Sequence, residues 1–295
     1  MKTENRIKSL LIKLGISTEN SIVSFFPKVR DRNDVAVLKC EKSGVIFLSR
    51  SDHMNITHYN KKENFRYWGA QDRKMALLTG LEDAQRRFEQ FKNIVANKKW
   101  IDIGTGAGGI LDLLSPIALE TAAVEPQEQA RKSLSDLGYR VYSLVEDVEE
   151  KDFDIVTLFH VLEHFTDPIN TLKSIKSKMA KGGKIVVEVP HAKDFLISFL
   201  DNEPFKSFTF WSEHLILHTR ESLNIFLKTA GFSKIVIKGF QRYPLANHLY
   251  WLAHGKPGGH TIWHSLRTAQ LENAYSDMLS SIDRTDALIA IAENW

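Results

Sequence analysis

The segment KKWIDIGTGAGGILDLL, Lys98 to Leu114, determines the fold class that the sequence predicts. Four glycines fall within six residues, between Gly104 and Gly109, directly after one apolar run and directly before another. A strand that runs into glycines and then a helix places bare backbone N–H groups and a helix N-terminus at the carboxyl edge of a sheet. A tight turn without a ligand would not need so many glycines, because glycine weakens the start of a helix. The segment therefore predicts a ligand-binding loop.

The chain around this loop alternates strand and helix patterns. Helices are expected between most of the strands, and the one that begins at Asp167 and Pro168 is expected to stop at the pair Gly182–Gly183. Strands that alternate with helices need crossover connections, which predicts an α/β fold with a doubly wound, largely parallel sheet. The expected strands cover 99–104, 121–126, 140–145, 153–159, 184–190 and 234–240.

Three parts of the chain differ in composition and in their predicted pattern of helices and strands. Residues 1–71 contain an amphipathic helix and then a hairpin, in which EKSG joins DVAVLKC to GVIFLSR. Residues 72–240 and 282–295 form the predicted core, which starts with a helix over about 72–97 and ends with the strand DALIAIAE. Residues 241–281 are mostly helical and rich in aromatic side chains, and we interpret them as an insertion.

Composition excludes several classes of protein. The formal net charge of the 295-residue chain is +3 and its positive residues are scattered, so neither a nucleic acid nor a membrane surface is an expected partner. No apolar run approaches the roughly 18 residues of a membrane span. The one cysteine, Cys40, excludes an intrachain disulfide or a cysteine-rich zinc site. A cytoplasmic location is the simplest expectation.

The glycine spacing leaves the ligand open. Gly104, Gly106 and Gly109 also fit the dinucleotide pattern G-x-G-x-x-G, so an NAD-dependent oxidoreductase is one hypothesis. Glu125, at the end of the second strand, suits ribose hydroxyls in either case. Asp102 separates a dinucleotide from a ligand with an ammonium group, because a carboxylate there repels a pyrophosphate but can bind an ammonium group.

Four motifs occur in order: WIDIGTGAGG, AVEP, EDVEE…FDIVTLFHVLEHFTDP and GGKIVVEVPH. Together, over about 98–239, they resemble the class I S-adenosylmethionine-dependent methyltransferases. The resemblance implies a Rossmann-like methyltransferase sheet that ends in an antiparallel strand pair, with S-adenosylmethionine as cofactor. The cofactor-binding residues that it implies are Asp102, Gly104, Thr105, Gly106, Gly108, Glu125, Pro126, Asp147, Val148, Phe159 and His160.

The charges near the loop support this cofactor. S-adenosylmethionine is a sulfonium cation that carries an ammonium group, so carboxylates suit it. The sequence supplies Asp102, Glu125 and Asp147, and no lysine or arginine lies between Ile101 and Glu128. This pattern favours S-adenosylmethionine over a dinucleotide.

Histidine is the side chain best suited to act as a base near neutral pH, and three groups of histidines compete for that role. His160 and the Glu163–His164 pair follow the fourth strand, and the pair fits a capping or loop-packing role equally well. His191 follows the fifth strand and is expected to face the site. The third group, FWSEHLILH, contains Glu213 and His214.

The sequence layout of the third group is similar to that of sugar C- and O-methyltransferases. In those enzymes a Glu-His pair lies at the acceptor. The resemblance implies that Glu213 and His214 act there, with His214 as the base and His191 as its alternative. Methyl transfer is then expected to slow as the pH falls through about 6.5. Nucleotide-sugar relatives carry zinc-binding cysteines near the N-terminus, and this chain keeps only Cys40.

The insertion offers candidates for binding the acceptor. Tyr243 and Trp251 could stack on a sugar or another ring, Arg242 could hold a phosphate, and His254 lies close to them in sequence. A helical cap that packs its aromatic side chains on the core is the alternative. The spacing of the histidines matches no standard ligand pattern, so no metal is predicted.

The sequence therefore predicts methyl transfer to a small-molecule acceptor, a sugar or sugar phosphate that is nucleotide-linked or a precursor of a surface glycan. Two other hypotheses remain at this point. One is the NAD-dependent oxidoreductase, and the other is a nucleotide-binding scaffold without catalytic activity.

Overall fold

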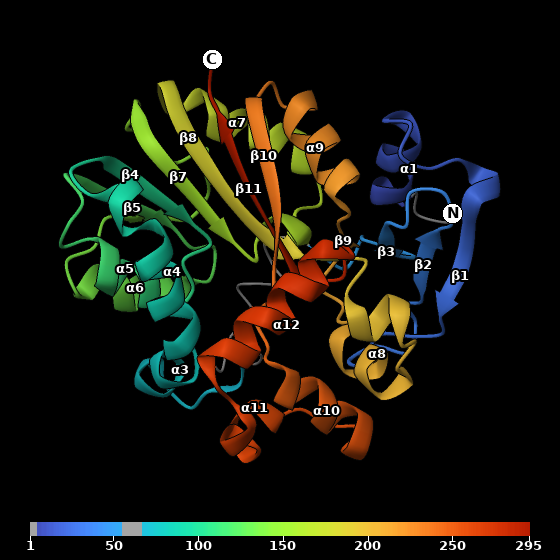
Figure 1. Ribbon diagram of the computed structural model, residues 1–295. Helices are drawn as coiled ribbons and strands as arrows, with labels where there is room; N and C mark the ends of the chain where they lie inside the picture. Colours follow the sequence, from blue (N-terminus) through green and yellow to red (C-terminus); the bar gives the residue numbers. More distant parts are fainter. Residues whose placement is uncertain (1–4, 55–66) are drawn as a thin grey trace.

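The computed structural model describes residues 5–54 and 67–295, and a seven-stranded sheet forms its centre (Figure 1). The strand order is β10-β11-β8-β7-β4-β5-β6. The pairs from β8 to β6 are parallel, whereas β11 is antiparallel to both β8 and β10. The doubly wound sheet and its terminal antiparallel pair are thereby confirmed. The strands are β4 (Lys99–Ile103), β5 (Glu120–Val124), β6 (Val141–Tyr142), β7 (Phe153–Phe159), β8 (Met179–Pro190), β10 (Ser233–Phe240) and β11 (Ala287–Glu293).

Both faces of the sheet are buried at its inner strands, from β11 to β5, which explains their nearly continuous apolar runs. Successive side chains of a strand point to opposite faces. Ile155 of β7 packs in one hydrophobic cluster and Val156 in the other. The first cluster includes residues of α4 (Leu81–Val95), α5 (Gly109–Leu114) and α6 (Glu128–Asp136), and the second includes residues of α7 (Pro168–Ser177) and α9 (Arg220–Thr229).

Glycines shape the connections of the sheet. Gly108 precedes α5 with φ +81°, and a Cβ atom there would lie 2.5 Å from Cδ2 of Leu134, so the loop needs glycine at this position. The pair Gly182–Gly183 does not stop α7, as the sequence analysis expected. Helix α7 ends at Ser177, and β8 runs through both glycines. A Cβ atom on Gly183 would lie 2.9 Å from the backbone oxygen of Phe153, so the glycine allows β8 to approach β7 where their register shifts.

The N-terminal part builds a second, four-stranded sheet, which Figure 1 shows beside the central one. Its expected hairpin is confirmed, because β2 (Val37–Cys40) and β3 (Ile46–Leu48) pair antiparallel after α1 (Arg6–Lys13) and β1 (Ile22–Phe26). Strand β9 (Ile216–Leu217) joins β3 from the region between β8 and α9. The helix expected over 72–97 is two helices, α3 (Arg73–Thr79) and α4, which Gly80 separates.

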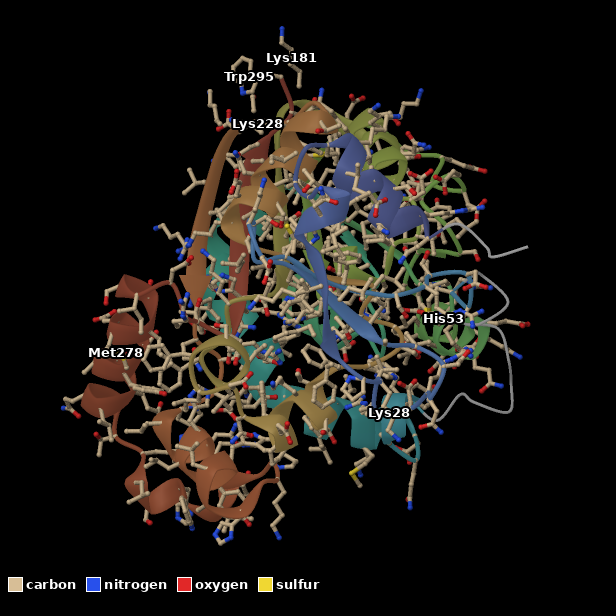
Figure 2. All side chains as sticks on the ribbon, turned by 90° about the vertical axis from the view of Figure 1, so that its right-hand side faces the viewer. Lys28, His53, Lys181, Lys228, Met278 and Trp295 are labelled. Atoms are coloured by element: carbon tan, nitrogen blue, oxygen red, sulfur yellow. The ribbon has the colours of Figure 1, made fainter. Side chains whose placement is uncertain are left out.

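Residues 241–281 are helical, as expected. They form α10 (Leu245–His254), α11 (Gly259–Ile262) and α12 (Ala269–Ser281), below the sheet in Figure 1. Figure 2 shows Met278 on the outer side of this insertion, and Trp295 at the opposite end of the molecule. Trp251 is buried and packs against rings of Phe205 in α8 (Glu203–Thr209) and Phe208.

Within the part of the chain that the structure describes, no helix has the length and apolarity that crossing a membrane requires.

The position of β11 between two strands leads to a stability prediction. We expect Ala290→Asp to lower the free energy of unfolding by about 4 kcal/mol or more, because it buries an unpaired carboxylate in the sheet. Val236→Asp on the edge strand β10 is the control, since Val236 is 56% exposed. Urea unfolding monitored by circular dichroism measures both variants. Equal stability of the two variants would contradict the burial of β11.

Candidate active site

A buried carboxylate ties the glycine loop to the neighbouring strand. Glu125 lies directly after β5, and its Oε2 accepts a hydrogen bond of 2.8 Å from the backbone N–H of Gly106. Its Oε1 accepts one of 2.8 Å from the backbone N–H of Gln127. Burial raises the pKa of Glu125 to about 7, although these N–H groups favour the ionised form. The carboxylate thus fixes the loop at the carboxyl edge of the sheet.

Two cavities open at this edge and share Gly104 in their walls. The larger one has a volume of about 470 Å³, within the usual range for small-molecule sites, and the smaller has about 190 Å³. The larger cavity runs from the glycine loop and Glu125 to Trp211, Glu213 and His214. The smaller one lies between the glycine loop and helices α3 and α4.

The smaller cavity combines a carboxylate with a guanidinium group. Asp102 is buried there, and burial raises its pKa to about 6 although Thr157 donates a hydrogen bond to it. Arg87 reaches the same cavity from α4, with its guanidinium carbon 4.7 Å from the ring centre of Phe159. The buried hydroxyl of Thr105 lies beside this carboxylate and lowers its pKa. A negative group, a positive group and a hydroxyl together fit the amino-acid end of S-adenosylmethionine.

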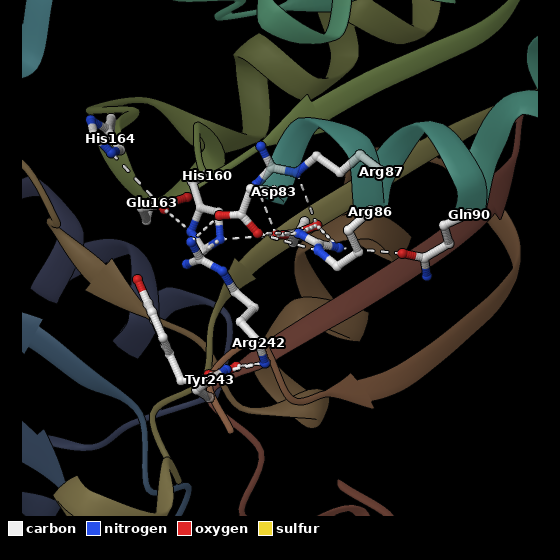
Figure 3. Close-up of polar contacts among 11 residues, drawn as sticks. Asp83, Arg86, Arg87, Gln90, His160, Glu163, His164, Arg242 and Tyr243 are labelled. Carbon is white, nitrogen blue, oxygen red and sulfur yellow. Dashed lines mark hydrogen bonds and ion pairs between the residues drawn. The ribbon is translucent and has the colours of Figure 1, made fainter. Parts of the chain in front are cut away.

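His160 lies at the centre of a partly buried network of charges (Figure 3). It follows β7 with φ +57°, a conformation that is strained for a residue other than glycine. Its Nδ1 lies 3.3 Å from Oε1 of Glu163, and its Nε2 lies 3.1 Å from Oε1 of Glu188. Burial and Arg242 lower the pKa of His160, but its hydrogen bonds to these carboxylates outweigh them and raise it. His160 is therefore held between two carboxylates and the guanidinium of Arg242.

The same network fixes Arg242. Its guanidinium forms an ion pair with Asp83 of α4 and lies beside His160 (Figure 3). Arg86 and Arg87 of α4 pair with Glu188 at 2.8 and 2.9 Å. The sequence analysis expected Arg242 to bind a phosphate; the structure pairs its guanidinium with Asp83 and places it outside the walls of both cavities.

The far end of the larger cavity brings together two histidines and two glutamates. Nδ1 of His164 lies 3.7 Å from Oε2 of Glu213, and its Nε2 lies 4.0 Å from Oε1 of Glu163. The rings of His164 and His214 are 5.2 Å apart between centroids. Burial and the nearby His164 lower the pKa of His214 to about 3, so His214 is neutral at physiological pH. The ligand atoms of Glu163, His164 and His214 also lie within 4.8 Å of one another, close enough to serve one metal ion.

Most predicted cofactor residues reach the two cavities. Asp147 and Val148 do not: Asp147 is exposed and accepts a hydrogen bond from the backbone N–H of Leu144, and Val148 is buried in the core. Glu146 lines the larger cavity in their place. Gly108 caps α5 behind the loop. The residues on the cavity walls are Gly104, Gly106, Glu125, Pro126 and His160 in the larger cavity and Asp102, Gly104, Thr105 and Phe159 in the smaller.

His191 does not face the site, and that expectation is wrong. Its side chain is fully buried, and its Nδ1 lies 3.0 Å from the backbone oxygen of Thr285. Burial lowers the pKa of His191 to about 4. It lines neither cavity, so it is not a candidate base.

The other acceptor-binding candidates of the insertion also lie outside both cavity walls. Trp251 belongs to the packed interior of the insertion, and His254 lies against the rings of Tyr250 and Trp263. Tyr243 is 38% exposed, with its ring beside the guanidinium of Arg242. The interpretation as a cap with packed aromatic side chains describes Trp251 correctly.

This geometry agrees with the comparisons with known proteins. The profile of the family described as Methyltransferase domain matches residues 67–236. The chain belongs to this methyltransferase family. Its fold and cofactor are those of the S-adenosylmethionine-dependent class, and the NAD-dependent hypothesis is therefore set aside.

Curated relatives cover part of the chain. It is 25% identical over 147 residues to the ubiquinone biosynthesis O-methyltransferase of Methylococcus capsulatus, an alignment that spans 46% of this chain and only 62% of that protein. It is 28% identical over 177 residues to the protein of the same name from Ralstonia nicotianae, which covers 54% of this chain and 73% of the relative.

Solved structures share the fold at low identity. One is an S-adenosylmethionine-dependent methyltransferase from Thermotoga maritima, described as a possible histamine N-methyltransferase. It has a TM-score of 0.52 and 15% identity, covering 82% of this chain and 100% of that one. An S-adenosylmethionine-dependent methyltransferase from Archaeoglobus fulgidus has a TM-score of 0.50 and 19% identity, with coverage of 79% and 100%.

The two buried acids lead to a binding prediction. We expect Asp102→Asn and Glu125→Gln each to raise the Kd for S-adenosylhomocysteine about tenfold or more, because each removes a charged hydrogen-bond acceptor. Calorimetric titration measures the change, and circular dichroism checks folding. Asp147→Asn is the matched control, since Asp147 lies outside both cavity walls. Parental affinity of the first two variants would contradict this placement of the cofactor.

Proposed function

We propose that this chain transfers the methyl group of S-adenosylmethionine to a hydroxyl oxygen of a small-molecule acceptor. The larger cavity supports the proposal. It starts at the glycine loop and Glu125, and it ends at His164, Glu213 and His214. A cofactor at the first end and an acceptor at the second would share one cavity, as direct displacement requires.

The chain's own residues would hold the cofactor by charge and hydrogen bonding. We propose that Asp102 accepts from the ammonium group and that Glu125 accepts from the ribose hydroxyls. We propose that Arg87, which also pairs with Glu188, attracts the carboxylate. When bound, S-adenosylmethionine supplies a methyl group that its sulfonium sulfur activates. The protein then contributes alignment of the two partners and exclusion of water.

His214 is the proposed base for the acceptor's proton, with Glu213 beside it. The low pKa of His214 keeps a lone pair available on its neutral ring. Because His214 stays neutral at pH 6.5, we no longer expect methyl transfer to slow as the pH falls through that value. A hydroxyl oxygen becomes strongly acidic as it gains a methyl group, so a weak base can accept its proton late in the reaction. His164, which pairs with Glu163 and Glu213, supports the ring of His214 from one side.

Oxygen as the accepting atom is supported by the relatives, which are named O-methyltransferases. The sugar acceptor of the sequence analysis has no such support. Among the described residues, the wall of the larger cavity contains no lysine or arginine that would hold a phosphate, and Met54, Phe165 and Trp211 give it apolar surface. We therefore favour an uncharged hydroxylated acceptor with an apolar or aromatic body.

A kinetic experiment tests the base. We expect His214→Ala to lower kcat by about 10²-fold and to leave the Kd for S-adenosylhomocysteine within about twofold, because the residue belongs to the acceptor end. Turnover is followed as S-adenosylhomocysteine release with catechol and a nucleotide-linked sugar as probe acceptors. His254→Ala, an exposed histidine of the insertion, is the matched control and should keep parental turnover.

The outcomes separate the alternatives. Near-parental turnover of His214→Ala would remove His214 as the base. Loss of parental turnover in EDTA, restored by a divalent metal, would show that Glu163, His164 and His214 act through an ion. Turnover of the nucleotide-linked sugar but not of catechol would support the sugar acceptor that the sequence analysis predicted. Cofactor binding without turnover of either probe would favour the non-catalytic scaffold.

A further inference from the structure

Asp102 is the last member of a short hydrogen-bonded chain that begins at Trp100. The indole Nε1 of Trp100 donates to Oγ1 of Thr157 at 2.9 Å, and Oγ1 of Thr157 donates to Oδ1 of Asp102 at 2.6 Å. All three side chains are buried. Trp100 and Asp102 belong to β4, and Thr157 of β7 is the register partner of Asp102. The backbone of two paired central strands therefore fixes every member of the chain.

The direction of the chain is fixed as well. An indole N–H can only donate, so Thr157 must accept from Trp100. A threonine hydroxyl has a single hydrogen, and the one acceptor that the described contacts offer it is the carboxylate of Asp102. The distance of 2.6 Å is typical of a hydroxyl that donates to an ionised carboxylate.

We infer that Thr157, oriented by Trp100, is a positioning residue for the amino-acid end of the cofactor, because it fixes the rotamer of Asp102 and favours its ionised form. This inference rests on the proposed placement of the cofactor. Neither residue was a candidate in the sequence, although both lie inside the quoted motifs, because the contact between Thr157 and Asp102 follows from the pairing of β4 with β7. Their contribution is made through Asp102, which lines the smaller cavity.

The charges around Asp102 give the inference a pH signature. Burial opposes ionisation of Asp102, whereas the hydroxyls of Thr157 and Thr105 and the charge of Arg87 in α4 favour it. The charge of Asp102 in turn raises the pKa of the neighbouring Glu125. A ligand ammonium needs the carboxylate ionised, so affinity is full above the pKa of Asp102, about 6, and falls below it. Removal of the Thr157 hydroxyl raises that pKa, so the loss of affinity must move to higher pH.

The experiment compares two ligands on matched variants. Thr157→Val removes the hydroxyl at nearly constant volume, and Thr157→Ser restores it. S-adenosylhomocysteine carries the ammonium group, whereas 5′-methylthioadenosine lacks the whole amino-acid part. Calorimetry between pH 5 and pH 8 gives the Kd of each ligand. We expect Thr157→Val to raise the Kd for S-adenosylhomocysteine about tenfold near neutral pH, to move its acidic limb upward and to leave methylthioadenosine unchanged, while Thr157→Ser stays near the parent.

Two results would overturn the inference. One is an equal loss for both ligands, which would mean that Thr157 only supports the fold. The other is a parental Kd and pH profile in Thr157→Val while Asp102→Asn weakens S-adenosylhomocysteine. If Asp102→Asn itself has no effect, the placement of the cofactor fails instead. Trp100→Phe is the second variant should Thr157→Val not fold: it frees the hydroxyl to rotate, and it should weaken S-adenosylhomocysteine but not methylthioadenosine.

Discussion

The contact on which the site depends is the pair of hydrogen bonds that Glu125 accepts from Gly106 and Gln127. A carboxylate buried in a protein needs such donors, because water no longer solvates it. One donor lies in the glycine loop after β4 and the other lies two residues after Glu125 itself, so the hydrogen bond from Gly106 ties the loop to the end of β5. The two cavities share Gly104 in this loop. The hydrogen bonds to Glu125 therefore help to set the position of the loop that both cavities share.

The ligand-free site keeps two acids in surroundings that disfavour their charge. Burial raises the pKa of Asp102 to about 6 and that of Glu125 to about 7. Carboxylates with raised pKa values beside an open cavity are typical of binding sites. A positive or hydrogen-bonding ligand can stabilise their ionised form, which burial in the protein disfavours. Glu163 differs: burial raises its pKa, but the hydrogen bond and charge of His160 lower it to about 2, so its partner is already part of the protein.

Sequence periodicity predicted the sheet well, because every central strand is buried on two faces and its apolar run is long. It failed where a distant contact decides the local structure. The Gly182–Gly183 pair resembles a helix stop, yet the close approach of β8 to the Phe153 backbone is what requires glycine there. Within the site, motif residues such as Glu125 were predictable from position alone. Arg87 was not, because its role follows from the packing of α4 over the loop.

The insertion contacts the site through a charged residue and not through the aromatic side chains that dominate its composition. Its aromatic side chains suggested stacking on a ligand, but Trp251 packs inside the protein, and the insertion reaches the site through Arg242. That guanidinium, paired with Asp83, stands behind His160, whose strained backbone at the end of β7 is held by Glu163 and Glu188. An ion pair inside a protein contributes little net stability, since desolvation offsets the attraction, but breaking it is costly. The network therefore fixes where His160 lies in the cavity wall more than it stabilises the fold.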